Sequence, residues 1–545
     1  MQKMSFRANA NQQISLSDRL NNLTERERRI LDKSWAKPFG DRIFPMIDEQ
    51  EFAVLYCEDN GRPNTPVNVV VGSLLLKELT QVIDEDLHES IMLDIRYQYA
   101  LGMTSMTEIP FSDRTISRFR ERLYWHEMET GEDLIKEEIE RLSGEFAKLM
   151  GIKGTLKRVD SLMVSSSCKK MGRLELIYTC VSNLVRALIK SGESGQLPER
   201  LMKYAEEGDK NSVCYRLEKD EVAPRLEEVT ADALLLYELA AYAQGGCDEY
   251  QLLERLISDQ TKNGQLKPNK EISPKSLQNP SDEDATFRRK AGKGYQGYVA
   301  NVVEDCGEKG SIITQYDFQA NLYSDAEFGA DVINSLGPQE ERTVVITDGA
   351  FASEDNFKLA EENNIELVTT ALTGQKPPEV IADFEIQDNV ITACPAGHAP
   401  IDCSYKPEKE EYRAHFDKSS CESCPHREDC PVKFQKKSAV VQISQSTIER
   451  AEYGKKLTTE QYKAYARTRN GVEGNPSVLR RRYGVDYMPV RGLVRSKMWF
   501  GFKIGAMNVK KVIAFLFIYL CVGVTCNFLP LFASKKRCQM ASVIV

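Results

Sequence analysis

Two short stretches decide the fold of this chain: TLKRVDSLMV at residues 155–164 and RTVVITDG at residues 342–349. The first alternates apolar and polar side chains, which is typical of a β-strand with one buried face. The second carries a Val-Val-Ile run and predicts a short buried strand. Each stretch holds one aspartate, Asp160 in the middle of the first and Asp348 after the apolar run of the second. Because a charge in a buried strand is costly unless it is paired, both aspartates need a partner.

Two acids on neighbouring strands can converge on a shared divalent cation. Mg²⁺ and Mn²⁺ prefer carboxylate and water ligands, and phosphoryl-transfer sites use this arrangement. The alternative for a single aspartate at a strand end is a turn or a helix cap, and Asp348 precedes Gly349 as a turn aspartate does.

Strands and helices alternate through the second half of the chain. The predicted strands are 294–303, 310–318 and 365–370, and the predicted helices are 325–336 and 354–363. The order is therefore β-β-β-α-β-α-β, with a long and mostly helical stretch, residues 171–280, after the first strand. Such an order predicts an α/β fold with a mixed sheet, rather than a β-sandwich or a helical bundle.

The first 150 residues are helical in pattern, with helices expected at 67–82, 86–101 and 114–123. In the last of these, Ile116, Phe119 and Leu123 share one face. Three arginines line another face, which predicts either a DNA contact or an ordinary solvated surface. These arginines are Arg114, Arg118 and Arg122.

Composition excludes several classes of protein. Of the 545 residues, 41% are hydrophobic and 28% are charged, as in soluble globular proteins. The net charge of −9 argues against a protein that coats DNA by bulk charge, but it leaves room for local basic surfaces.

No secretory signal opens the chain, so clustered cysteines are interpreted as metal ligands and not as disulfides. The apolar run at 512–525 is shorter than the ~20 residues of a membrane span, which favours a buried helix or strand over a membrane-anchored nuclease.

A third acid lies near a basic stretch. A helical interpretation of residues 465–473 places Arg469 and Glu473 four residues apart on one face, where the alternative is a surface ion pair. Residues 480–511 follow with nine basic side chains and one acidic side chain. A basic track beside carboxylates suits a polyanion that is cut at a metal site. The arginines predicted to bind phosphate are Arg469, Arg480, Arg481, Arg482 and Arg491.

A cysteine cluster lies between residues 394 and 430. Cys421, Cys424 and Cys430 have the spacing C-x2-C-x5-C, and Cys394 precedes them. Together they are the preferred ligand set for one structural Zn²⁺, in which His398 or Cys403 could replace one thiol. Buried free thiols are the alternative, and an iron–sulfur cluster is the less favoured occupant.

Several ordered blocks resemble bacterial insertion-sequence transposases of the DDE type, which have a ribonuclease-H-like core (the IS-four-like clan, nearest to its IS-eleven-eighty-two branch). The blocks are Arg158-Val159-Asp160-Ser161, residues 281–298, Thr347-Asp348-Gly349-Ala350-Phe351, and the spacing of Arg469, Glu473 and Arg480. Two departures stand out. Ala466 occupies the expected tyrosine position, with Tyr465 one place earlier, and Arg480 replaces a lysine.

The resemblance implies a metal-dependent DNA transposase, a nuclease and strand transferase acting at the ends of its own element. Asp160, Asp348 and Glu473 would hold two Mg²⁺ or Mn²⁺ ions, and the cysteine-rich insertion would bind structural zinc. The implied partners are double-stranded DNA, as terminal inverted repeats and target, and a second copy of the chain; no membrane is implied. The expected location is the bacterial cytoplasm, at the nucleoid. The alternative is a regulator that binds DNA but has lost catalysis.

The predicted domains follow from these patterns. They are a helical DNA-binding domain at 1–150, a ribonuclease-H-like core at 151–374 and 441–520 with a helical insertion at 171–280, a zinc-binding insertion at 375–440, and a tail at 521–545 without an assigned role.

Overall fold

The computed structural model describes residues 4–9, 18–58, 61–105, 111–193, 195, 197–243, 246–290, 292–351, 353–370, 376–471 and 474–525. The chain divides into two compact units. Unit 1 contains residues 1–153, 161–324 and 475–545, and unit 2 contains residues 154–160 and 325–474.

A mixed sheet has the strand order β10-β9-β3-β7-β6, and β8 pairs with β7. The strands are β3 (Leu156–Ser165), β6 (Thr286–Lys290), β7 (Lys293–Gly307), β8 (Gly310–Ala320), β9 (Thr343–Thr347) and β10 (Ile365–Thr369). β3, β9 and β10 run parallel, whereas β6, β7 and β8 pair antiparallel. The structure confirms the five predicted strands and the mixed α/β class. It adds β6, whose sequence Thr-Phe-Arg-Arg-Lys lacks the apolar alternation of a buried strand because β6 lies at the edge of the sheet.

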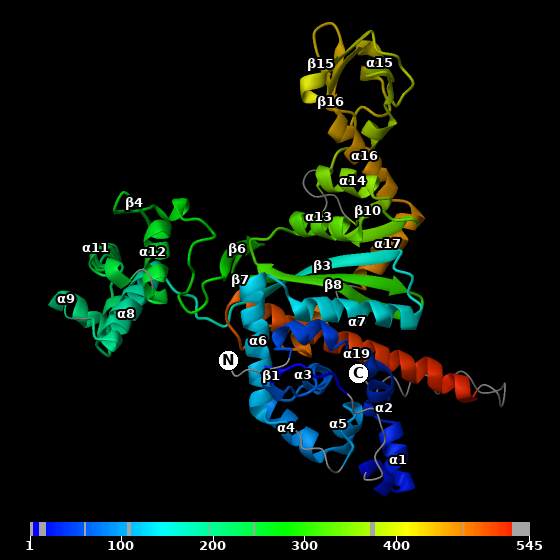
Figure 1. The fold of residues 1–545 in the computed structure, drawn as a ribbon. Helices are drawn as coiled ribbons and strands as arrows, with labels where there is room; N and C mark the ends of the chain where they lie inside the picture. The colour runs from blue at the N-terminus through cyan, green and yellow to red at the C-terminus, as the bar shows by residue number, and fades with distance from the viewer. Residues whose placement is uncertain are drawn as a thin grey trace. The chain divides into compact units, whose positions relative to one another are not determined.

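In unit 2, two helices follow their strands as predicted: α13 (Asp325–Leu336) and α14 (Glu354–Glu362). The cysteine-rich region forms its own four-stranded sheet in the order β13-β14-β16-β15. Its strands are β13 (Asp402–Lys406), β14 (Glu411–Phe416), β15 (Val432–Phe434) and β16 (Ala439–Ser444), and a hairpin of β11 (Glu385–Gln387) and β12 (Val390–Ala393) precedes it. The helices α16 (Gln445–Leu457) and α17 (Glu460–Asn470) then complete the unit (Figure 1).

In unit 1, the N-terminal helices share one hydrophobic core with β7, β8 and the long helix α19 (Leu493–Thr525). The helices in this region are α1 (Glu25–Asp32), α2 (Ala36–Pro38), α3 (Val67–Thr80), α4 (Asp84–Leu93), α5 (Ile95–Ala100), α6 (Asp113–Thr130) and α7 (Leu134–Met150). The helix expected at 86–101 is broken at Asp94, whose carboxylate caps α5. This hydrophobic core includes residues on both sides of residue 150. The domain boundary predicted at residue 150 stays a prediction.

α19 runs beside α7 (Figure 1), and it approaches its neighbours closely. A Cβ on Gly505 would lie 2.6 Å from side-chain carbons of Ile139 and Leu75, so glycine permits this packing. Asn508 is buried, and its amide donates to Ser143 Oγ at 2.8 Å and to the Ile313 carbonyl at 2.7 Å. Among the described residues, no helix combines the length and the apolar composition that a membrane span requires.

Of the four lysines in the basic stretch predicted over 480–511, three pair with carboxylates of unit 1. Lys497 pairs with Glu127 of α6 at 3.1 Å, Lys503 with Glu78 of α3 at 2.7 Å, and Lys511 with Glu304 of β7 at 2.5 Å. The three carboxylates come from segments far away in sequence. They neutralise α19 from inside, so a count of charges along the helix overstates its basic surface.

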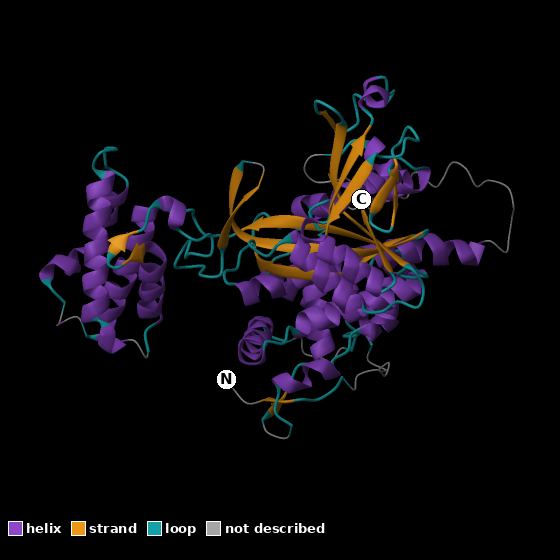
Figure 2. Cartoon of the chain, turned by 90° about the horizontal axis from the view of Figure 1, so that it is seen from above, coloured by secondary structure: helices purple, strands orange, loops and turns teal. Residues whose placement is uncertain are grey.

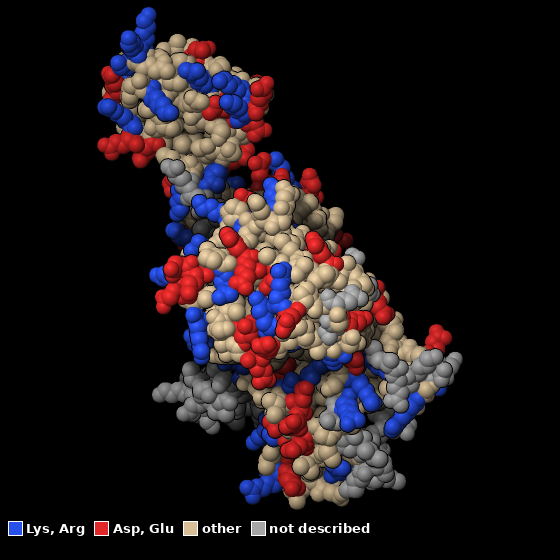
Figure 3. Space-filling view, turned by 90° about the vertical axis from the view of Figure 1, so that its left-hand side faces the viewer, with Lys and Arg blue, Asp and Glu red and all other residues tan. Residues whose placement is uncertain are grey.

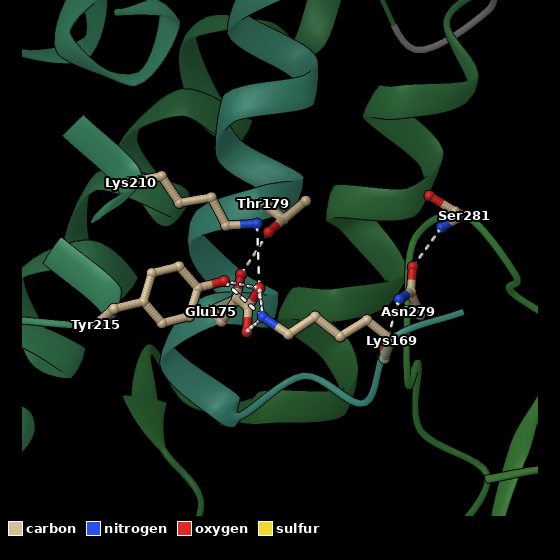
Figure 4. Close-up of polar contacts among 7 residues, drawn as sticks. All are labelled: Lys169, Glu175, Thr179, Lys210, Tyr215, Asn279 and Ser281. Atoms are coloured by element: carbon tan, nitrogen blue, oxygen red, sulfur yellow. Dashed lines mark hydrogen bonds and ion pairs between the residues drawn. The ribbon is translucent and has the colours of Figure 1, made fainter. Parts of the chain in front are cut away.

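The stretch 171–280 forms a helical bundle with a hydrophobic core of its own (Figure 2). Its elements are α8 (Arg173–Ser191), α9 (Glu199–Met202), α10 (Asp209–Cys214), α11 (Val222–Leu239), α12 (Asp248–Gln260), β4 (Thr261–Lys262) and β5 (Gln265–Leu266). Figure 4 shows the polar cluster at its base, where Glu175 binds Lys169 and Lys210, each at 3.2 Å, and accepts the Tyr215 hydroxyl. Asn279 donates to the Lys169 carbonyl at 3.0 Å, which ties together the segments that enter and leave the bundle.

Candidate active site

The pairing of β3 with β9 places the two predicted strand acids. Leu156 lies opposite Val344 and Arg158 opposite Ile346, in parallel register. Continued by two residues, this register would set Asp160 opposite Asp348, one residue past the end of β9. Neighbouring strands lie about 4.8 Å apart, and residues opposite each other point to the same face of the sheet. Both aspartates are half-buried.

Asp348 has contacts on both carboxylate oxygens. Its Oδ1 accepts a hydrogen bond from the Ala350 amide at 2.8 Å, which is the turn contact expected of an aspartate before glycine. Its Oδ2 lies 3.9 Å from the Arg469 guanidinium, whose side chain is only 16% exposed. The turn contact to Ala350 and the contact to Arg469 are thus compatible, because each uses a different carboxylate oxygen of Asp348.

Helix α17, which carries Arg469, is fastened to the strands of unit 2. Arg158 of β3 donates to the Thr468 carbonyl at 2.8 Å, and the Tyr462 hydroxyl donates to Glu366 of β10 at 3.1 Å. A Cβ on Gly471 would lie 2.2 Å from Arg158 Nη1, so only glycine leaves room for this arginine. The sequence pattern showed Arg158 only as a neighbour of Asp160, and its partner is 310 residues away.

Glu473 lies outside the described residues. α17 ends at Asn470 and α18 (Gly474–Arg481) begins one residue after Glu473, so the predicted placement of Arg469 and Glu473 on one helical face stays a prediction. Tyr465 lies against Tyr462, with ring centroids 5.7 Å apart, and its hydroxyl accepts from Gln461 at 3.1 Å. Both contacts are with residues of its own helix.

The remaining predicted phosphate-binding arginines differ in availability. Arg481, Arg491, Arg114 and Arg118 are exposed. Arg480, Arg482 and Arg122 are half-buried. Arg480 donates to the Met163 carbonyl at 3.0 Å and pairs with Asp486, Arg482 donates to the Leu79 carbonyl at 3.5 Å, and Arg122 donates to the Leu55 carbonyl at 2.9 Å. On the face drawn in Figure 3, basic and acidic side chains of the described residues are interspersed and form no continuous basic band.

The four predicted zinc ligands line one narrow pocket, with space of about 20 Å³ for a water-sized occupant. Burial raises the pKa of the Cys430 thiol to about 11, with smaller contributions from Cys421, Cys424 and Cys394. Four thiols around a single small space have the donor chemistry of a structural zinc site. However, within the ranges that the structure describes, no three His, Cys, Asp or Glu side chains stand together as a metal site, here or at Asp160 and Asp348.

We expect Gly471→Ala to displace Arg158, because the added methyl group takes the place of its guanidinium. Loss of the bond to Thr468 should loosen α17. Hydrogen exchange followed by mass spectrometry should then show faster exchange of the amides over 460–471, with little change in β9.

Gly474→Ala is the matched control, since nothing lies within 4 Å of a Cβ at this position. Equal protection of α17 in the Gly471→Ala variant and the parent would show that Arg158 does not hold the helix.

Two stretches of the chain match known families. Residues 393–513 match the family described as Transposase DDE domain, and residues 28–122 match Transposase domain (DUF772). The first match includes Arg469, Arg480 and the cysteine cluster, whereas Asp160 and Asp348 lie outside it. No curated protein and no solved structure matches the chain. Two stretches of the chain are thus similar to transposase domains, which supports a transposase role.

Proposed function

We propose that this chain is an insertion-sequence transposase of the IS-four-like clan, which cleaves DNA at the ends of its own element and transfers the freed strand to a target. Asp160, Asp348 and Glu473 are its acids in this proposal. The single observation that supports it best is the parallel β3–β9 register, which would set Asp160 opposite Asp348 if it is continued by two residues.

The donor chemistry fits a hard divalent cation, because both groups are carboxylates and Asp348 keeps Oδ2 clear of the turn contact. When bound, Mg²⁺ or Mn²⁺ activates an attacking oxygen and stabilises the leaving oxygen in phosphoryl transfer. The protein's own part is positioning. Arg469 orients Asp348 and offers a guanidinium to a phosphate, and Arg158 holds α17 against the strands.

Replacing Asp160 or Asp348 by asparagine should lower DNA cleavage by roughly 10²–10³-fold or more, while DNA binding persists, since each change removes one carboxylate and keeps the side-chain shape. Cleavage of a labelled duplex carrying the element's end, with Mg²⁺ or Mn²⁺, measures this. Asp355→Asn, at an exposed position of α14, is the control. A parent protein that binds the duplex but never cuts it would instead indicate the regulator without catalysis.

We propose that DNA lies over exposed arginines of unit 1 and not over the lysines of α19. Arg481→Gln with Arg491→Gln should weaken binding to every DNA sequence and lower the dependence of log affinity on log salt concentration by about 0.9 per lost contact. Lys503→Gln should instead lower thermal stability, because it leaves Glu78 without its ion-pair partner. A titration across salt concentrations measures the first effect and calorimetry the second. If Lys503→Gln alone altered the salt dependence, the assignment of these surfaces would be reversed.

We also propose that Cys394, Cys421, Cys424 and Cys430 bind one structural Zn²⁺. Metal analysis of the purified protein should give about one zinc per chain. Cys421→Ser with Cys424→Ser should lose that zinc and expose residues 376–440 to protease, whereas Cys57→Ser should change neither property. Zinc-free protein with the same protease resistance as zinc-loaded protein would contradict the proposal.

A further inference from the structure

An open pocket of about 670 Å³ lies on the cysteine-rich region. None of the four predicted zinc ligands is among the residues that line it. Three elements of unit 2 form it: the hairpin of β11 and β12, the turn between β13 and β14, and one face of α16. Small-molecule and peptide side-chain sites commonly have volumes of roughly 300–1,000 Å³. The pocket is therefore large enough to hold a long side chain together with part of the backbone that carries it.

The inner wall of the pocket is apolar and aromatic. Phe384 and Ile448 are buried at its base. Tyr405 and Tyr412 lie opposite each other on β13 and β14, with ring centroids 4.8 Å apart and planes inclined by 41°. The Tyr412 hydroxyl donates to Gln445 Oε1 at 3.0 Å, which fixes that ring. Tyr412 is buried, so the half-buried Tyr405 is the ring that can meet an alkyl stem and offer a π-face to a cation.

The rim of the pocket is acidic. Asp388 comes from the β11–β12 turn, Glu410 from the β13–β14 turn and Glu452 from α16, and all three are exposed. Among the described residues, no lysine or arginine lines the pocket. Several lysines stand near this rim: Lys455 pairs with Asp383, Lys358 pairs with Glu354 at 2.6 Å and also interacts electrostatically with Glu410, and Lys409 precedes Glu410 in the β13–β14 turn outside the pocket lining.

We infer that this pocket binds an arginine side chain presented by a protein partner. The stem lies along the tyrosine wall and the guanidinium lies among the three carboxylates. Arginine suits the site better than lysine, because its planar head both stacks on aromatic rings and forms paired bonds to carboxylates. The acidic rim repels phosphates, so the partner is a protein and not a nucleic acid. This interaction is separate from the proposed DNA chemistry.

Isothermal titration of the full chain with the peptide acetyl-Gly-Arg-Gly-amide tests the inference. We expect saturable binding that weakens with salt, and no binding of the citrulline peptide, which keeps the shape but lacks the charge. Glu410→Gln with Glu452→Gln should lower the affinity about tenfold or more. Glu385→Gln, an exposed position on β11 outside the pocket lining, should leave the affinity unchanged.

Three results would overturn the inference: no binding of the arginine peptide, equal binding of the citrulline peptide, or unchanged affinity in the double variant. Free arginine that binds as tightly as the peptide would overturn the assignment to a protein partner. DNA cleavage by the double variant should equal that of the parent, so failure of the DNA proposal and failure of this one are distinguishable.

Discussion

The parallel pairing of β3 with β9 is the constraint on which the candidate site depends. Its register, continued by two residues, would set Asp160 opposite Asp348, and a shift by one residue would turn one carboxylate to the opposite face of the sheet. Neighbouring carboxylates repel each other unless a cation lies near them, and Arg469 supplies one positive charge at 3.9 Å from Asp348.

A second contact links the strand of Asp160 to helix α17. Arg158 lies two residues before Asp160 on β3 and binds the backbone of α17 at Thr468. This contact, together with the Tyr462–Glu366 bond, holds α17 to the strands, and Gly471 leaves the space that Arg158 needs. Arg158 thus links the strand that carries Asp160 to the helix that carries Arg469.

Periodicity in the sequence was sufficient to predict β3, β7, β8, β9 and β10, because each strand buries one or both faces and shows this in its residues. It was insufficient for β6, an edge strand, and for the sheet of the cysteine-rich region, where β13 reads Asp-Cys-Ser-Tyr-Lys and has little apolar alternation. The two strand acids could be recognised because they interrupt apolar runs. The Arg158–Gly471 contact could not, since steric fit between distant residues leaves no local pattern. The ion pairs of Lys497, Lys503 and Lys511 could not be predicted for a related reason, because their partners Glu127, Glu78 and Glu304 come from three separate elements.

Binding of Mn²⁺ followed by electron paramagnetic resonance tests most directly whether Asp160 and Asp348 form one site. The parent chain should bind Mn²⁺ saturably, and Asp160→Asn and Asp348→Asn should each abolish the same binding step, because each removes half of a shared pair. Asp355→Asn should leave the titration unchanged. Undiminished Mn²⁺ binding in either of the two site variants would contradict the account, since it would show that the two carboxylates do not share a metal ion.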